Sequence, residues 1–157
     1  PHADSLFTAG LLHDIGQLII FNRLPEQARK ALRLSTQDPH AMDMRRAEQK
    51  VLGFDHAQVG GLLLRHWQLP ALLEECVTYH HAPEKAARFP VEAAIVHIAN
   101  SIATLAEINS TNLEDVPKIQ AGAWKVSGLK EEVVEPVMHE TQKQFREARL
   151  LFLSDAA

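Results

Sequence analysis

The sequence predicts an all-α protein that folds as a compact bundle of several helices. Apolar side chains recur three or four residues apart along most of the 157 residues, which is the spacing of one face of a helix. No stretch of useful length alternates apolar and polar residues, as a half-buried strand would. A chain of this length suits one domain over residues 1–157, and such a domain buries roughly 70% of the surface of its unfolded chain.

The first helix is predicted over 4–21, because Asp4 or Ser5 can cap its start and Pro25 follows its end. Its apolar residues at helical spacing, expected to form a buried face, are Leu11, Ile15, Leu18 and Ile19. The adjacent residues His13 and Asp14 lie in the middle of this helix. Because an unpaired buried carboxylate costs several kcal/mol, Asp14 needs a partner nearby.

The remaining helices follow from the same spacing and from proline and glycine at their ends. They are predicted over 25–35, 41–52, 56–67, from Pro70 to the segment 79–83, and over 91–107, 119–126 and 130–153. The helix over 41–52 carries many charged residues and is interpreted as a solvated surface helix. The apolar faces of the others predict buried side chains that include Ala28, Leu32, Leu62, Leu72, Cys76, Ile98, Val137 and Phe145.

Composition and charge exclude several classes of protein. The net charge of −4 at pH 7 argues against a general binder of nucleic acid or of anionic membranes. No apolar run approaches the ~20 residues that a membrane helix requires, and no signal-peptide pattern is visible before the first predicted helix. The single cysteine, Cys76, excludes an intramolecular disulfide and fits a cytoplasmic protein.

Four polar sites stand out from these apolar helices. They are His13-Asp14, His56, His80-His81 and Asn100. Imidazoles and carboxylates together suit Mn, Fe or Zn ions, and a binuclear cluster of this kind can activate water and clamp a phosphoryl group. Each site also has a structural interpretation. His13 and Asp14 can form a buried hydrogen-bonded pair, His56 can belong to a capping turn, and His80-His81 can complement the end of a helix.

The order of the motifs resembles that of the HD superfamily of metal-dependent phosphohydrolases, and most of all its HDOD branch, the HD-related output domain of bacterial signalling proteins. The resemblance covers roughly residues 5–107. The segments that carry it are Leu11-Leu12-His13-Asp14-Ile15-Gly16, Gly53-Phe54-Asp55-His56-Ala57-Gln58-Val59-Gly60, Trp67-Gln68-Leu69-Pro70 and His80-His81-Ala82-Pro83. It implies a helical bundle of the HD-domain type.

By the same resemblance, five residues match metal ligands of active relatives: His13, Asp14, His56, His80 and His81. Two positions depart from the active pattern. Gln17 stands where a phosphate-binding lysine is usual, and Asn100 replaces a ligand aspartate. The upstream helices of the family are absent, so the chain is expected to be a C-terminal fragment of a longer domain.

These departures favour a bacterial, cytoplasmic signal-transduction output or protein-interaction domain with a degenerate, non-catalytic HD site. The alternative is a metal-dependent phosphohydrolase or cyclic-dinucleotide phosphodiesterase that uses the His/Asp cluster. No cofactor is expected, and the alternative would require a divalent metal such as Mn or Fe. The expected partners are other signalling proteins or domains, with self-association and without nucleic acid or membrane.

Overall fold

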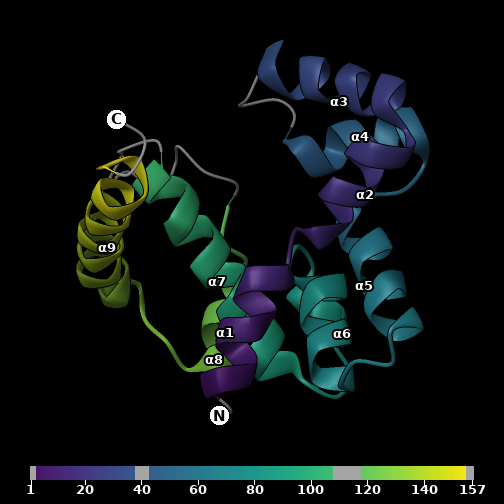
Figure 1. The fold of residues 1–157 in the computed structure, drawn as a ribbon. Coiled ribbons are helices and arrows are strands. Elements are labelled where there is room, and N and C mark those ends of the chain that lie inside the picture. Colours follow the sequence, from purple (N-terminus) through teal and green to yellow (C-terminus); the bar gives the residue numbers. More distant parts are fainter. Residues whose placement is uncertain (1–2, 38–42, 108–117, 155–157) are drawn as a thin grey trace.

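A computed structural model describes residues 3–37, 43–107 and 118–154 of the protein, and these residues form helices joined by short turns (Figure 1). The prediction of an all-α fold is confirmed, since none of the described residues lies in a strand. The α-helices are α1 (Ala3–Leu12), α2 (Ile15–Arg23), α3 (Pro25–Gln37), α4 (Met44–Leu52), α5 (His56–His66), α6 (Ala71–Tyr79), α7 (Pro90–Glu107), α8 (Ala121–Ser127) and α9 (Val134–Ser154). Two short 3-10 turns are η1 (Pro83–Lys85) and η3 (Glu131–Val133). None of the described helices combines the length and the apolar character needed to cross a membrane.

The prediction of one continuous helix over 4–21 is wrong, because the chain turns at His13 and Asp14 and forms α1 and α2 instead. The ring Nδ1 of His13 lies 2.7 Å from the carbonyl oxygen of Gly10, and the main-chain N–H of Gln17 donates to the carbonyl oxygen of Asp14 at 2.9 Å. The turn allows α1 to pack on α6 and α7 while α2 packs on α3 and α5. The His-Asp pair therefore lies at a junction between two helices.

Because of this turn, part of the face that was predicted to be buried is exposed. Leu11 is 69% exposed and Leu18 is 65% exposed, because a single helical period does not continue through a change of direction. The buried residues of the two helices are instead Ala9, Gly16 and Ile20. A Cβ at Gly16 would collide with the carbonyl of His56 and lie 2.7 Å from the main-chain nitrogen of Gly60. The backbones of α2 and α5 thus touch directly, which brings Asp14 close to His56.

The end of α4 and the start of α5 lie at the residues that were predicted to cap them. The Asp55 carboxylate accepts the main-chain N–H of Gln58 at 3.0 Å and the Gln58 side chain accepts that of Asp55 at 3.0 Å, which forms a capping box. Gly53 ends α4 with φ 83°, a left-handed conformation that favours glycine. The interpretation of α4 as a solvated surface helix is wrong for its inner face, since Ala47 and Glu48 are both fully buried.

The core consists of two apolar clusters. The first joins α1, α5, α6 and α7 and contains Ala9, Leu64, Leu72, Leu73, Cys76, Val77 and Val96. The second joins α7, α8 and α9 and contains Ala94, Ile98, Ile102, Leu105, Ile119, Ala123, Val134 and Met138. Several predicted core residues are exposed instead: Leu32 (43%), Leu62 (63%), Val137 (46%) and Phe145 (67%). In two of these helices the buried face consists largely of small residues, so the larger neighbouring side chains are exposed. These small residues are Ala28 and Ala31 in α3 and Gly60 and Gly61 in α5.

Candidate metal centre

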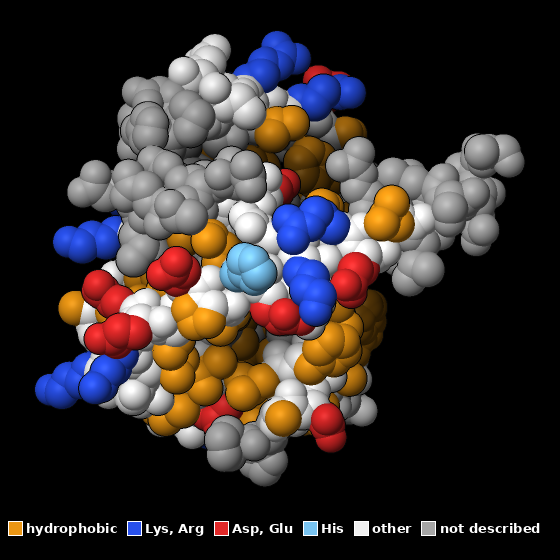
Figure 2. All heavy atoms as spheres, turned by 90° about the vertical axis from the view of Figure 1, so that its left-hand side faces the viewer, with side chains coloured by type: hydrophobic (Ala, Val, Ile, Leu, Met, Phe, Trp, Pro, Cys, Tyr) orange, Lys and Arg blue, Asp and Glu red, His pale blue; other side chains and the backbone are white. Residues whose placement is uncertain are grey.

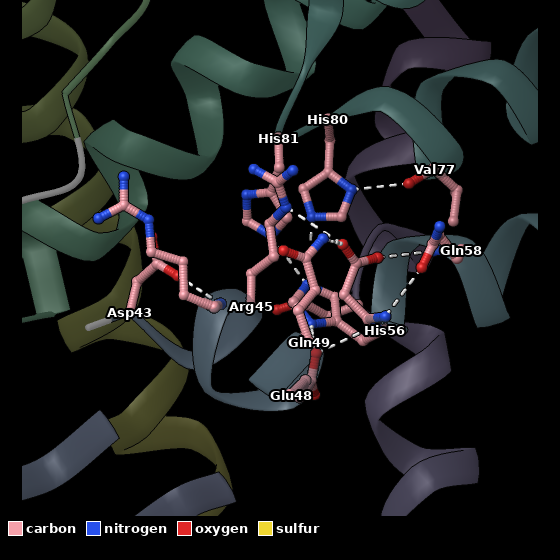
Figure 3. Close-up of polar contacts among 12 residues, drawn as sticks. Asp43, Arg45, Glu48, Gln49, His56, Gln58, Val77, His80 and His81 are labelled. Carbon is pink, nitrogen blue, oxygen red and sulfur yellow. Dashed lines mark hydrogen bonds and ion pairs between the residues drawn. The ribbon is translucent and has the colours of Figure 1, made fainter. Parts of the chain in front are cut away.

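The candidate site lies where three separate parts of the fold meet. Asp14 comes from the turn between α1 and α2, His56 from the first residue of α5, and His80 and His81 from the turn that ends α6. Each of these four residues offers one ligand atom, and the four atoms lie within 4.8 Å of one another. Figure 3 shows the rings of His80 and His81 next to each other, with centroids 4.0 Å apart. We refer to Asp14, His56, His80 and His81 as the His/Asp cluster.

The Asp14 carboxylate is the centre of the cluster. Its Oδ1 atom lies 3.2 Å from Nε2 of His56 and 3.5 Å from Nε2 of His80. Its Oδ2 atom lies 3.3 Å from Nε2 of His13, whose ring centroid is 5.1 Å from that of His80. On the open side of His56, the Nε2 atom is 2.9 Å from Nε2 of His81. The ε-nitrogens of the histidines thus converge on one carboxylate.

Three of these rings are oriented by an acceptor at the opposite nitrogen. Nδ1 of His13 lies 2.7 Å from the Gly10 carbonyl oxygen, and Nδ1 of His80 lies 2.7 Å from that of Val77. Since a carbonyl oxygen can only accept, each Nδ1 carries a proton, and in the neutral ring Nε2 then keeps its lone pair on the side that faces Asp14. Histidines that ligate metals are held in this way by a second group behind the ring.

The third acceptor is Glu48, a residue that the sequence analysis missed. Its Oε2 atom lies 2.6 Å from Nδ1 of His56 and accepts the main-chain N–H of the same residue at 2.8 Å (Figure 3). Glu48 is completely buried. Nothing in the local sequence distinguishes this glutamate from the other charged residues of α4, because its burial depends on how α4 meets the start of α5.

Asp55 anchors the same junction from outside the cluster. Besides capping α5, its Oδ2 atom accepts Nε–H of Arg45 at 3.1 Å and the side-chain amide of Gln49 at 2.8 Å. The structural interpretation of His56 as part of a capping turn is confirmed, since His56 directly follows this cap. One short segment both begins a helix and presents an imidazole to Asp14.

The charges of the cluster follow from burial and from the neighbours of each group. Burial opposes ionisation of Asp14, but contacts with His13, His56 and His80 outweigh it and hold the pKa of its carboxyl well below the usual range. Burial likewise opposes protonation of His56, but the carboxylates of Asp14 and Glu48 raise the pKa of its imidazole to about 9. Burial, reinforced by repulsion from His80 and His56, lowers the pKa of His81 to about 2. Nε2 of His56 thus faces both Oδ1 of Asp14, at 3.2 Å, and Nε2 of His81, at 2.9 Å.

These residues fit a divalent cation. Within the described part of the chain, four buried atoms in or directly behind the site have no hydrogen-bond partner of good geometry: Nε2 of His13, Oδ1 of Asp14, Oε1 of Glu48 and Nε2 of His80. Such atoms are costly to bury unless something compensates them. A carboxylate and neutral imidazoles are ligands that Mn, Fe and Zn share. A cation bound between these ring nitrogens would displace any proton that they hold, because histidines ligate metals in the neutral form.

Beyond His13, the site is lined mainly by apolar side chains. A cavity of about 310 Å³ there is lined by Leu6, Gly10, His13, Ile95, Val96, Ala99, Asn100 and Ala103. Burial opposes protonation of His13, but Asp14 and then weaker contacts that include the Asn100 side chain raise the pKa of its imidazole. Asn100 therefore lies beside His13, and it brings a neutral amide. Gln17 lies in α2, half-buried, and no contact joins its side chain to the cluster among the described residues.

The chain is similar in sequence and in fold to known proteins. The HDOD domain family matches residues 1–83, just over half of the chain. An uncharacterized protein from Treponema pallidum (strain Nichols) is 29% identical over 90 residues, which cover 53% of this chain and 16% of that protein.

Two crystal structures share the fold. A candidate signal transduction protein from Marinobacter aquaeolei VT8 superposes with a TM-score of 0.76 at 22% identity, over 92% of this chain and 31% of that one. A candidate phosphohydrolase from Shewanella amazonensis SB2B gives a TM-score of 0.52 at 24% identity, over 88% of this chain and 54% of that one. The chain thus spans about half or less of the length of the proteins that it matches.

Proposed function

Because the chain belongs to the HDOD domain family, we propose that it acts as a non-catalytic output domain of a bacterial signalling protein, and that its His/Asp cluster holds one divalent metal ion. The departures at Gln17 and Asn100 favour a site without metal when the sequence is taken alone. The convergence of the ε-nitrogens on Asp14, which only the fold brings about, favours one ion. We give this convergence more weight than the two substitutions.

The observation that carries the proposal is the orientation of His56 and His80. Each ring has its Nδ1 atom within 2.7 Å of a buried oxygen acceptor, and each Nε2 atom lies within 3.5 Å of the same Oδ1 of Asp14. A buried His-Asp pair with a purely structural role needs only one contact between an imidazole and the carboxylate. Two rings directed at one oxygen, with a third ring 2.9 Å from the first, are typical of a ligand set. An ion bound there would act as a Lewis acid and would cross-link α2, α5 and the turn after α6.

The proposed absence of catalysis is supported by the residues around His13, where a second metal ion would have to bind. Two-metal hydrolytic centres hold their ions about 3.5–4 Å apart and share ligands between them. Beyond Asp14, the described residues offer only the imidazole of His13 and the neutral amide of Asn100 for a second ion. An amide carries no charge to offset that of a second cation. The lysine that would hold a phosphate is replaced by Gln17, whose side chain has no charge either.

Signalling by such a domain requires a surface that binds another protein or domain. Exposed apolar side chains provide one candidate, since Phe7 and Leu11 of α1 are both 69% exposed. Figure 2, which views the molecule from the left of Figure 1, shows hydrophobic side chains gathered in the lower half of that face. Contiguous apolar patches on a soluble domain are typical of interaction sites.

Metal content is the test of the ion. The protein is produced without an affinity tag or chelator and its metals are measured by mass spectrometry. We expect about one Mn, Fe or Zn ion per chain, the number that one tetrahedral or larger ligand set can hold. His81→Ala should abolish binding, while the matched control His66→Ala, an exposed histidine of α5 outside the cluster, should retain it. Metal-free protein that does not gain stability with any of these ions would contradict the proposal.

The same cluster favours the second candidate function, a metal-dependent phosphohydrolase, because a bound ion can activate water toward a phosphoryl group. Bis-p-nitrophenyl phosphate and cyclic dinucleotides are assayed with Mn, Fe(II), Mg or Ni. We expect no hydrolysis above that of Asp14→Ala. Metal-dependent turnover that Asp14→Ala removes would establish the enzyme instead.

A further inference from the structure

The two main-chain carbonyls of the His80-His81 pair are bound by residues from a later part of the chain. Nδ1 of His97, in the middle of α7, lies 2.7 Å from the carbonyl oxygen of His80. The side-chain amide of Gln120, just before α8, donates to the carbonyl oxygen of His81 at 3.2 Å. Carbonyls at the end of a helix lack partners within that helix, so these two contacts satisfy the end of α6.

A third hydrogen bond joins the two residues to each other. The main-chain N–H of Gln120 donates to Nε2 of His97 at 3.2 Å. Because Nε2 accepts this bond, the proton of His97 is on Nδ1, which donates to His80. His97 is buried, with 6% of its surface exposed, and its imidazole therefore connects the main chain of a cluster residue to the start of α8. We refer to His97 and Gln120 as the latch.

The latch lies where the two apolar clusters of the core meet. His97 follows Val96, which belongs to the first cluster, and precedes Ile98, which belongs to the second. Gln120 stands between Ile119 and α8, and Ile119 and Ala123 pack in the second cluster. The hydrogen bonds of the latch thus connect the His80-His81 turn to the start of α8, which packs on α7.

We propose that His97 and Gln120 are positioning residues that link occupation of the His/Asp cluster by a metal ion to the docking of α8 on α7. This inference rests on the proposed function, because it requires the cluster to bind an ion. The latch holds the backbone from which His80 and His81 project, so an ion that fixes their rings also fixes the latch. Linkage is reciprocal: loss of the latch weakens metal binding, and loss of the metal loosens α8.

Zn²⁺ titrations test both directions. The protein contains two tryptophans, and Trp124 of α8 packs against the second cluster, whereas Trp67 is 54% exposed. In a Trp67→Phe background, Trp124 fluorescence reports on α8 and calorimetry reports the dissociation constant for Zn²⁺. We expect Zn²⁺ to change Trp124 emission in the parent protein. His97→Phe should weaken Zn²⁺ binding by roughly 10- to 100-fold, the effect of losing an outer-shell partner, and should abolish the Trp124 response.

Three further variants separate positioning from general damage to the fold. Gln120→Ala removes only the bond to His81 and should weaken binding less. His97→Gln can both donate and accept and should restore part of the affinity and of the Trp124 response. Ser101→Ala removes a buried hydrogen bond to the carbonyl of His97 one turn further along α7 and should leave both readouts unchanged.

The outcomes distinguish this inference from the proposed function. Parent-like Zn²⁺ affinity in His97→Phe, or a Trp124 response that survives in it, would overturn the linkage and leave the metal site intact. Failure of the parent protein to bind Zn²⁺, Mn²⁺ or Fe²⁺ would overturn both. If His97→Phe does not fold, His97→Gln and Gln120→Ala decide, and parent-like affinity in both refutes the latch.

Discussion

Glu48 and His56 form a completely buried carboxylate–imidazole pair in which Oε2 lies 2.6 Å from Nδ1. The same oxygen accepts the main-chain N–H of His56 at 2.8 Å, so the carboxylate holds both the backbone and the ring of this residue. The pair fixes the direction in which Nε2 of His56 points. It also supplies negative charge behind a ring whose front faces Asp14.

Glu48→Gln should lower the pKa of His56 from its raised value of about 9, because the substitution removes one of the two carboxylates that stabilise the imidazolium. It should also reduce the free energy of unfolding by roughly 1–3 kcal/mol, the usual cost of damaging a buried hydrogen bond. Titration of the imidazole by NMR in metal-free protein measures the first effect. Glu26→Gln, at an exposed position of α3, is the control. An unchanged pKa of His56 would show that Asp14 alone is responsible.

Gly16→Ala should destabilise the fold, since its Cβ would collide with the carbonyl of His56 and press on the main chain of Gly60. Overpacking typically costs about 1–3 kcal/mol, and backbone cannot move aside as a side chain can. Gly10→Ala is the matched control in α1, where nothing lies within 4 Å of the new Cβ. That control should be stabilised by up to about 1 kcal/mol through helix propensity. Equal unfolding midpoints in urea for the two variants would be incompatible with direct contact between α2 and α5.

The stabilising effect of Glu75 should disappear in acid. Its Oε2 atom accepts the main-chain N–H groups of Arg88 and Phe89, both at 3.0 Å, and its Oε1 atom accepts Nε–H of Arg88 at 2.9 Å. Burial opposes ionisation, but these bonds outweigh it and lower the pKa of the carboxyl below its usual value of 4.5. Because the pKa is lower in the folded state, the stabilisation is present above 4.5 and is lost as the pH falls through the folded value. The difference in unfolding free energy between the parent and Glu75→Gln should therefore shrink as urea titrations move from neutral pH to below pH 4.5. A constant difference would exclude this linkage.

The exposed face of α1 should drive self-association of this chain. Phe7 and Leu11, both 69% exposed, stand four residues apart and so lie together on one side of the helix. Phe7→Ser combined with Leu11→Ser should reduce concentration-dependent association in analytical ultracentrifugation, together with the binding of a hydrophobic dye. Leu62→Ser, at an apolar residue of α5 that is 63% exposed, serves as the comparison and should change neither. A parent protein that stays monomeric at all concentrations would refute the prediction.

Much of the fold could be predicted from local sequence. Asp55 and Gly53 mark the start of α5 and the end of α4 as expected, because capping depends on a few neighbouring side chains. The faces of the helices were less predictable. Leu11, Leu18 and Leu32 are exposed although they lie on apolar stripes, because a stripe shows only that a face can be buried and does not identify the helix that covers it.

For the candidate site, the sequence by itself determined the residue types and their order: His13, Asp14, His56, His80 and His81, with neutral residues at Gln17 and Asn100. Only the tertiary structure decided which of them meet. It placed Asp14 at a turn between helices, brought His56, His80 and His81 to it and set His13 between Asp14 and a cavity that Asn100 also lines. It also buried Glu48 and joined His97 and Gln120 to the His80-His81 turn. These contacts connect residues far apart in the chain, and their formation depends on how whole helices pack, which no local pattern of side chains encodes.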